Sequence, residues 1–284
     1  CDDYVTMSDG TGIVHIAPGF GEDDYWACKK AGVPLVCPVD EKGRYTEIIE
    51  AFAGRNVMEA NMDVLRYLKA ENKVILDGSI VHNYPHCWRC KTPLIYKSMD
   101  AWYFNIEKVK GKLIEKNKEI NWIPETVKQG RFGNWLNNAR DWNISRNRYW
   151  STPIPIWKCD ECGKKNVLGS IKEIADVSGI KLENLHRQYM DKVTYKCNCG
   201  GTMRRVPEVL DCWFESASVP FAQKHYPFEN KDLFEQQFPA QFISEAVDQT
   251  RGWFHSLMAE STLLFNKAPY ENVIVLGHVQ DENG

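Results

Sequence analysis

Two pairs of closely spaced cysteines place the tightest constraint on how this chain can fold. Cys159 and Cys162 lie in CDECG, Cys197 and Cys199 lie in CNCGG, and residues 163–196 separate the pairs. Four thiolates in two close pairs suit a tetrahedral zinc ion, and they leave no open position for catalysis. We therefore expect one structural zinc site, with a helix over 171–178 bridging the two pairs.

A third cysteine pair, Cys87 and Cys90 in HCWRC, is only half of a metal site. Two thiolates rarely hold zinc alone, so His82, His86 or residues outside this chain would have to complete it. A redox role would require a thioredoxin-like βαβ context, which this segment does not provide. With six of its 10 cysteines in such pairs, the chain is typical of a metal-binding protein of the reducing cytoplasm.

Length and charge argue against several other classes of protein. The 284 residues suffice for about two domains, and no apolar run approaches the roughly 18–20 residues of a membrane-spanning helix. The acidic opening does not predict a signal peptide. Because the net charge is −3, any contact with nucleic acid must be local.

The candidate for such a local contact is the segment WLNNARDWNISRNRYW. Its Arg140, Arg146 and Arg148 lie between aromatic residues, a composition that suits phosphate contact and base stacking. It is equally typical of a solvated basic loop packed by its tryptophans. From these residues alone, both interpretations stay open.

Hydrophobic patterns predict a mixed α/β first part of the chain. GIVHIA at 12–17 reads as a strand, and residues 22–32 as a short helix with acids in its first turn and Gly32 at its end. A hairpin is expected around 40–43. Two further helices are expected over 56–72 and 105–118.

The last part of the chain predicts a βαβ unit. Strands are expected at 241–244 and 272–279, joined by a helix over 248–265 with Phe254, Leu257, Met258, Ser261, Leu264 and Phe265 on one face. Polar residues at the carboxyl end of such a strand are where parallel sheets bind ligands. Asp248 is the candidate here, with a helix N-cap as the alternative; Trp213 and Trp253 are by default core residues.

Six motifs occur in one order along the chain: GTGIVHIAPGFGEDDY, YPHCWRCKTPLIY, DWNISRNRYW with TPIPIW, LDCWFES and DQTRGWF. With them the sequence resembles the isoleucyl-tRNA synthetases, a family of class I aminoacyl-tRNA synthetases. Valyl and leucyl enzymes are similar, but they tend not to have histidine at the position of His15, and they lack the DQxRGWF form.

The resemblance implies an α/β fold: the second half of a Rossmann-like nucleotide-binding fold, part of a mixed α/β editing insertion, and a small zinc-ribbon-like insertion. The implied domains are the C-terminal part of the editing (connective peptide) domain at 1–75 and a stem with the half zinc site at 76–150. The zinc-binding insertion at 151–205 and the second half of the catalytic domain at 206–284 follow.

The implied activity is ATP-dependent activation of isoleucine and its transfer to tRNA(Ile), with hydrolytic editing of valine. One methylene provides only about 1–3 kcal/mol of discrimination, a limit for which this family is itself the usual example. By resemblance, Asp24 holds the ammonium of misattached valine, and His15 lies beside its ester. Aromatic residues such as Trp213 and Trp253 line the isoleucine pocket.

Other roles also come from the resemblance. Glu245, Asp248 and Gln249 match polar positions near the aminoacyl-adenylate, and His278 lies where the adenine is expected. The implied cofactors are structural Zn²⁺ and, with ATP, Mg²⁺. The implied partners are isoleucine, ATP and tRNA(Ile), with no membrane, and the parent enzyme is expected to be monomeric and cytoplasmic.

The sequence also departs from the family. It contains neither a HIGH-type nor a KMSKS-type motif, nor the threonine-rich part of the editing pocket. We therefore expect an internal part of a synthetase that is inactive alone, with Cys87 and Cys90 sharing zinc with an upstream CxxC. Ser151 stands where the family often has glycine, and Ala217 is a second small substitution.

Alternative functions remain. One is a valyl- or leucyl-type synthetase, and another is a free-standing aminoacyl-tRNA deacylase, which would need the whole editing pocket. A zinc-ribbon RNA-binding protein would explain the cysteines and ISRNRYW, but not LDCWFES and DQTRGWF.

Overall fold

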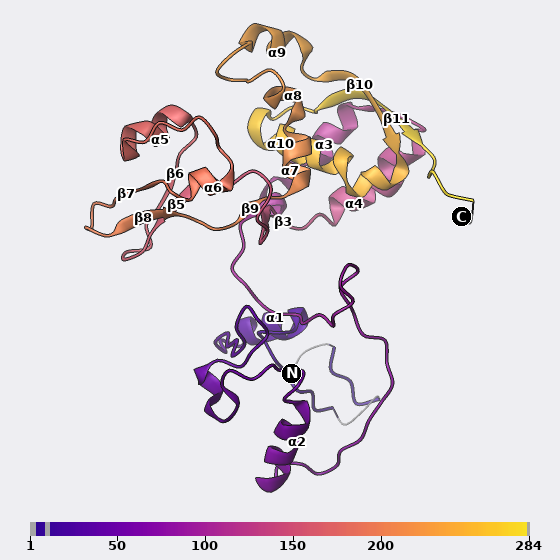
Figure 1. The fold of residues 1–284 in the computed structure, drawn as a ribbon. Helices are drawn as coiled ribbons and strands as arrows, with labels where there is room; N and C mark the ends of the chain where they lie inside the picture. Colours follow the sequence, from indigo (N-terminus) through magenta and orange to yellow (C-terminus); the bar gives the residue numbers. More distant parts are fainter. Residues whose placement is uncertain (1–3, 9–11, 283–284) are drawn as a thin grey trace. The chain divides into compact units, whose positions relative to one another are not determined.

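The computed structural model describes residues 4–8 and 12–282. The chain divides into two compact units, residues 1–100 and residues 101–284, which are considered separately (Figure 1). The four predicted domains stay predictions. Within the described part of the chain, no helix has the length and apolar character needed to cross a membrane.

The first unit is built from short helices and loops. It contains α1 (Glu22–Lys30), the 3-10 helix η1 (Glu47–Phe52) and α2 (Asn61–Ala70). The helix predicted at 22–32 is confirmed, with three acids in its first turn, where they interact favourably with the helix dipole. The helix predicted over 56–72 is also present, but it begins later, at residue 61.

The strand predicted at 12–17 is wrong. These residues form no strand, and Ile13 is 85% exposed. A strand requires a neighbouring strand to satisfy its backbone groups, and no described segment pairs with this one. The alternating apolar pattern therefore has no sheet to join here.

The hairpin predicted around 40–43 is reduced to a tight turn closed by a single bridge between Val39 and Tyr45. The Asp40 carboxylate accepts hydrogen bonds from the backbone N–H groups of Lys42 and Arg44, at 2.8 and 2.9 Å. These bonds lower the pKa of Asp40, the bond from Arg44 having the largest effect. Gly43 has φ +71°, the left-handed conformation that glycine adopts without strain.

The second unit contains a parallel sheet of three strands in the order β10-β11-β2. The strands are β10 (Ala240–Ala246), β11 (Tyr270–Leu276) and β2 (Asn121–Ile123). Helix α10 (Trp253–Phe265) connects β10 to β11, so the predicted βαβ unit is confirmed. The third strand, β2, was not predicted, because three residues are too few for a recognisable pattern.

The predicted helix over 248–265 is broken at Gly252. Residues Val247–Arg251 form the 3-10 helix η3, and α10 begins only at Trp253. Gly252 has φ −131° and ψ −117°, which is outside the helical region. The predicted apolar face of α10 is correct for Phe254, but Leu264 is 60% exposed.

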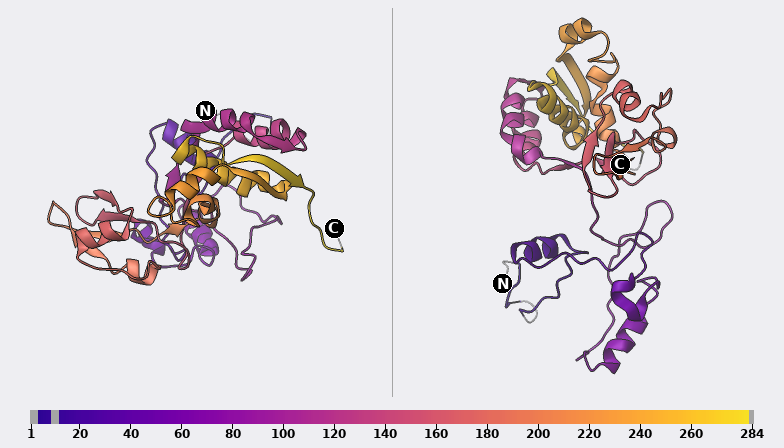
Figure 2. Two further views of the ribbon diagram at one scale, coloured as in Figure 1. Left: turned by 90° about the horizontal axis from the view of Figure 1, so that it is seen from above. Right: turned by 90° about the vertical axis from the view of Figure 1, so that its left-hand side faces the viewer.

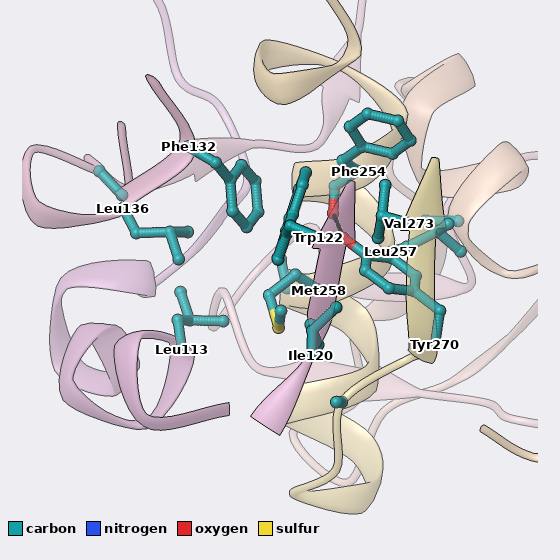
Figure 3. Close-up of a cluster of buried hydrophobic side chains, with 14 of the residues drawn as sticks. Leu113, Ile120, Trp122, Phe132, Leu136, Phe254, Leu257, Met258, Tyr270 and Val273 are labelled. Carbon is teal, nitrogen blue, oxygen red and sulfur yellow. Dashed lines mark hydrogen bonds between the residues drawn. The ribbon is translucent and has the colours of Figure 1, made fainter. Parts of the chain in front are cut away.

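Trp122 is the centre of the main core of this unit (Figure 3). Its ring lies 4.8 Å from that of Phe132 and 5.6 Å from that of Phe254. Its indole Nε1 donates to Asn117 Oδ1 at 2.9 Å. The surrounding helices are α3 (Ile106–Glu119), the π-helix η2 (Lys128–Phe132) and α4 (Gly133–Asn137); α3 confirms the helix predicted at 105–118.

We expect Trp122→Ala to lower the free energy of unfolding by about 3–5 kcal/mol, because it leaves a cavity between three aromatic rings. Trp122→Phe should lower it by about 1–3 kcal/mol, since Asn117 loses its indole partner. Leu264→Ala is the matched control and should change it by about 0.5 kcal/mol or less. Urea unfolding of the 284-residue chain measures all three; equal losses in all variants would contradict this picture of the core.

A second module follows in the chain, between residues 156 and 205. Four antiparallel strands lie in the order β6-β5-β8-β7, and two helices connect them. The module projects to one side of the parallel sheet in Figure 1 and in the left view of Figure 2. Its small core is centred on the fully buried Trp157. The elements are β5 (Ile156–Cys159), β6 (Lys165–Val167), α5 (Ile171–Ser178), α6 (Arg187–Met190), β7 (Thr194–Lys196) and β8 (Thr202–Arg205).

Short strand pairs join this module to the rest of the unit. They are β1 (Tyr103–Phe104) with β3 (Trp142–Asn143), and β4 (Ser145–Arg146) with β9 (Val209–Leu210). The chain then continues into α7 (Cys212–Ala217), α8 (Val219–Ala222) and α9 (Lys231–Gln237) before it enters β10.

Candidate functional site

The four cysteines of the module come together at its tip. Their sulfur atoms all lie within 4.8 Å of one another. The closest approaches are 3.4 Å between Cys159 and Cys199 and 3.8 Å between Cys162 and Cys197. Each pair sits on a turn beside a strand, so the antiparallel pairing of β5 with β8 brings both turns to one point.

This arrangement fits a zinc ion. With Zn–S bonds of about 2.3 Å, tetrahedral geometry requires sulfur atoms roughly 3.8 Å apart. A Cβ on Gly201 would come within 2.8 Å of Cys159 Sγ, so only glycine leaves room for the turn here. The residues present therefore suit zinc, and they leave no position open to a substrate.

The electrostatics of the four thiols favour the same conclusion. The backbone N–H of Cys162 lowers the pKa of Cys159 to about 7. The backbone N–H of Gly201 lowers the pKa of Cys199, but the neighbouring thiols outweigh it and raise that pKa to about 12. Thiols this close cannot all ionise unless a cation compensates their charge.

Cys87 and Cys90 lie in the first unit, on a turn closed by hydrogen bonds between Cys87 N and Thr92 O and between Lys91 N and Cys87 O. A hydrogen bond with the Thr92 hydroxyl, at 3.0 Å, lowers the pKa of Cys90 to about 7. Among the described residues, no third ligand joins this pair. The Nδ1 atoms of His82 and His86 lie 2.9 Å from backbone carbonyl oxygens instead.

We expect one zinc ion per 284-residue chain by elemental analysis. Cys159→Ser should lower the content to near zero, because three thiolates hold zinc much more weakly than four. Cys90→Ser is the matched control and should leave it unchanged. Two zinc ions per wild-type chain would show instead that Cys87 and Cys90 find further ligands.

The second group of candidate residues surrounds Gly252, at the carboxyl end of β10. Gln249 Oε1 accepts a hydrogen bond from Trp253 N at 2.9 Å and so caps α10. A Cβ on Gly252 would lie 2.5 Å from Gln249 Oε1 and 3.1 Å from Trp213 Cη2. The structure therefore brings Trp213, Gln249 and Trp253 together around Gly252.

Trp213 is not a core residue, since it is 40% exposed, and Trp253 is half-buried. Both rings are available beside the sheet edge. Trp253 Nε1 donates to Ser216 O at 3.1 Å, which fixes its ring against α7. The default interpretation of Trp213 as buried is therefore wrong, and the pair presents apolar surface near polar groups.

Three other predicted residues lie at or beyond the carboxyl ends of β10 and β11. Asp248 accepts a hydrogen bond from Gln249 Nε2 at 2.8 Å and is not an N-cap; Ala246 precedes η3 and Gly252 precedes α10. Glu245 is exposed at the penultimate residue of strand β10, and His278 is exposed two residues beyond β11. No hydrogen bond within residues 101–282 joins His278 to the others.

In the first unit, Asp24 lies in the first turn of α1. Its Oδ2 accepts a hydrogen bond from Ala17 N at 2.9 Å, which fixes the Pro18–Gly21 turn against the helix. His15 is exposed on the segment that enters this turn. His15 therefore precedes this turn, and Asp24 follows it at the start of α1.

A groove of about 910 Å³ lies between β9, the start of α7 and the loop before α6. On its walls Trp150 stacks on His186, with ring centroids 4.6 Å apart. The predicted basic segment divides here: Arg146 pairs with the buried Asp211 at 2.9 Å, whereas Arg148 is exposed.

Glu215, which sequence reasoning missed, anchors one wall of this groove. Its Oε1 accepts from Thr152 N at 2.7 Å and lies 2.9 Å from the Ser151 hydroxyl. Burial raises the pKa of Glu215, but these hydrogen bonds bring it below its usual value. Ser151 has φ +152°, where glycine is favoured, and the one hydrogen bond that its hydroxyl donates, to Glu215 Oε1 or to Leu210 O, offsets part of that cost.

Residues 22–284 match the family of class I tRNA synthetases that comprises the I, L, M and V types, and the chain belongs to this family. The chain is 52% identical to the isoleucine–tRNA ligase of Treponema denticola over 283 residues, 99% of the chain and 26% of the relative. It is 51% identical to that of Clostridium tetani over 286 residues (99% and 27%) and 50% identical to that of Protochlamydia amoebophila over 283 residues (100% and 27%).

The chain thus spans about a quarter of the length of the curated relatives it matches. Among solved structures, part of the fold overlaps with Agrobacterium radiobacter K84 agnB2 LeuRS, in a ternary complex with tRNA and LeuAMS. The overlap has a TM-score of 0.35 and 19% identity, and covers 56% of this chain and 24% of the other.

Proposed function

We propose that this chain is part of an isoleucine–tRNA ligase that activates isoleucine with ATP, transfers it to tRNA(Ile) and hydrolyses misattached valine. The observation that carries the proposal is the grouping of Trp213, Gln249 and Trp253 around Gly252, at the carboxyl end of a parallel strand. This is the edge at which open α/β sheets bind ligands. Identity of 50–52% to isoleucine–tRNA ligases supports the same substrate.

In this proposal, the rings of Trp213 and Trp253 form apolar walls for the branched side chain of isoleucine. Flat, rigid aromatic surfaces suit such a ligand. Trp253 is held by Ser216 O and Trp213 by its close approach to Gly252, so the space between them is defined before the ligand binds. Such preorganisation lowers the entropic cost of binding.

The polar groups near these rings provide the remaining contacts. In this proposal, Glu245, Asp248 and Gln249 face the aminoacyl-adenylate, and His278 lies near its adenine. The parallel sheet then belongs to the second half of a Rossmann-like domain. Class I activation displaces pyrophosphate at the ATP α-phosphate, with Mg²⁺ compensating phosphate charge, and depends on positioning rather than on a covalent enzyme group.

We expect the full-length protein that contains this chain to catalyse isoleucine-dependent exchange of pyrophosphate into ATP. The isolated 284 residues should catalyse none above a control without enzyme, because they contain no HIGH-type or KMSKS-type motif. In the full-length protein, Trp213→Ala should raise KM for isoleucine about tenfold or more, since a buried apolar contact is lost. Leu264→Ala serves as the control.

Exchange that responds to valine or leucine but not to isoleucine would favour a synthetase of another type. No exchange with any of the three, together with hydrolysis of aminoacyl-tRNA, would favour a free-standing deacylase.

For editing, we propose that Asp24 binds the ammonium of valine on tRNA and that His15 orients the ester or the attacking water. The support is local: the turn places both residues on one loop, and Asp24 uses only Oδ2 for its bond to Ala17 N. The other carboxylate oxygen can then accept from a ligand. A carboxylate is the expected partner of an ammonium group.

Two substitutions of Asp24 separate its two roles. Asp24→Asn keeps an oxygen that can accept from Ala17 N but removes the charge, whereas Asp24→Ala removes both. We expect both variants of the full-length protein to accumulate Val-tRNA(Ile), with deacylation slowed at least about tenfold, the order expected for a charge-assisted bond. Wild-type deacylation in Asp24→Asn would show that Asp24 only holds the turn.

The module between 156 and 205 is proposed to be a structural zinc ribbon held by its four cysteines. Cys87 and Cys90 are proposed to share a second zinc with cysteines upstream of the present sequence. The groove beside Arg148 and the Trp150–His186 stack is the surface we assign to tRNA, since an exposed cation and stacked rings suit a nucleic acid strand. We place the whole enzyme, as a monomer, in the cytoplasm.

A further inference from the structure

Glu260 is an unusual residue for the middle of α10. It is 2% exposed, and the only hydrogen bond of its carboxyl group within the described chain joins Oε2 to the Ser218 hydroxyl, at 2.9 Å. Its other oxygen, Oε1, is buried without a partner in that same region. A buried polar atom without a hydrogen bond is costly, so the position requires an explanation.

The carboxyl group is protonated at neutral pH. Burial raises the pKa of Glu260 to about 8. Ser218 Oγ also lies 2.9 Å from Phe214 O, and one hydroxyl proton cannot serve two acceptors at once. A neutral Glu260 resolves this: its proton is donated to Ser218 Oγ, and the hydroxyl proton is donated to Phe214 O.

This hydrogen bond is one of several contacts that hold α7 to α10, beside the packing of Ala217 in the main core. At the start of α7, Trp213 Cη2 approaches Gly252 closely. Near its end, Ser216 O accepts from Trp253 Nε1. Ser218, the C-cap of α7, meets Glu260 two helical turns along α10 from Trp253. The contact of Trp213 fixes the start of α7, and the hydrogen bonds of Ser216 O and Ser218 fix its end.

We propose that Glu260 is a positioning residue for the isoleucine pocket: through Ser218 it sets the angle of α7 against α10, and hence the spacing of the Trp213 and Trp253 rings. The inference rests on the proposed function. A helix of only six residues is held by few contacts, so the loss of one hydrogen bond shifts it, and a small shift of one ring changes the fit of a branched alkyl chain. Neither residue touches the ligand in this arrangement.

Conservative substitutions are available for both Ser218 and Glu260. Ser218→Ala removes only the hydroxyl, and Glu260→Leu fills similar volume without a polar atom. Glu260→Gln retains a donor that can reach Ser218 Oγ and so mimics the neutral acid. Ser261→Ala is the matched control, because Ser261 is a buried serine of the same helix that donates to Lys267 O, away from α7.

The first measurement is isoleucine-dependent pyrophosphate exchange by the full-length protein. Ser218→Ala and Glu260→Leu should raise KM for isoleucine about fivefold or more, with kcat within about twofold of wild type. Glu260→Gln and Ser261→Ala should keep the wild-type KM. Unchanged KM in both Ser218→Ala and Glu260→Leu overturns the proposal, as does an equal rise in Ser261→Ala.

The second measurement does not depend on activity. Fluorine NMR of the 284-residue chain labelled with 5-fluorotryptophan, with the Trp213 resonance assigned by Trp213→Phe, reports the position of this ring. Its shift should change in Ser218→Ala and Glu260→Leu but not in Glu260→Gln or Ser261→Ala. If the full-length protein lacks isoleucine activation, the proposed function fails. The fluorine shifts then decide the positioning role alone, and an unmoved Trp213 resonance overturns it.

Discussion

The close approach of two side chains, Trp213 and Gln249, to Gly252 is the constraint on which the sheet edge depends. Because this residue has no side chain, Gln249 can turn back to cap α10 and Trp213 can lie against the backbone. A Cβ at this point would collide with both. The break between η3 and α10 therefore makes room for Trp213 and Gln249 to form a surface beside the connection of the βαβ unit.

The thiol cluster has a comparable role in the antiparallel module. That module has a core of few residues, centred on Trp157, and its strands are three or four residues long. A core of that size buries little apolar surface, and small domains of this kind usually need a metal or disulfides. Bringing four thiols to one point adds the missing constraint where β5 and β8 meet.

Local signals in the sequence predicted the βαβ unit, the helices at 22–32 and 105–118, and the meeting of the two cysteine pairs. Each signal is a local pattern: the spacing of apolar residues for the βαβ unit and the helix at 105–118, the acidic first turn for the helix at 22–32, and the close spacing within each cysteine pair. The strand at 12–17 failed because pairing depends on a partner strand, which a local pattern does not contain. Gly252 looked like a residue within a helix, because its conformation is imposed by Trp213 and Gln249. Glu260 was not singled out, because its burial and its contact with Ser218 depend on tertiary packing.

The chain enters and leaves the antiparallel module at neighbouring points, and this bears on how the module can vary. Leu210 N donates to Thr152 O at 2.7 Å and Val206 N donates to Ile156 O at 2.9 Å, so the two ends of the excursion lie side by side. A loop whose ends are already paired closes at nearly the same entropic cost whatever its length. Evolution can therefore lengthen, shorten or remove everything between these ends without moving Asp211 or Trp213. The module is an insertion, and chains that carry different insertions at this point can keep the same sheet-edge structure.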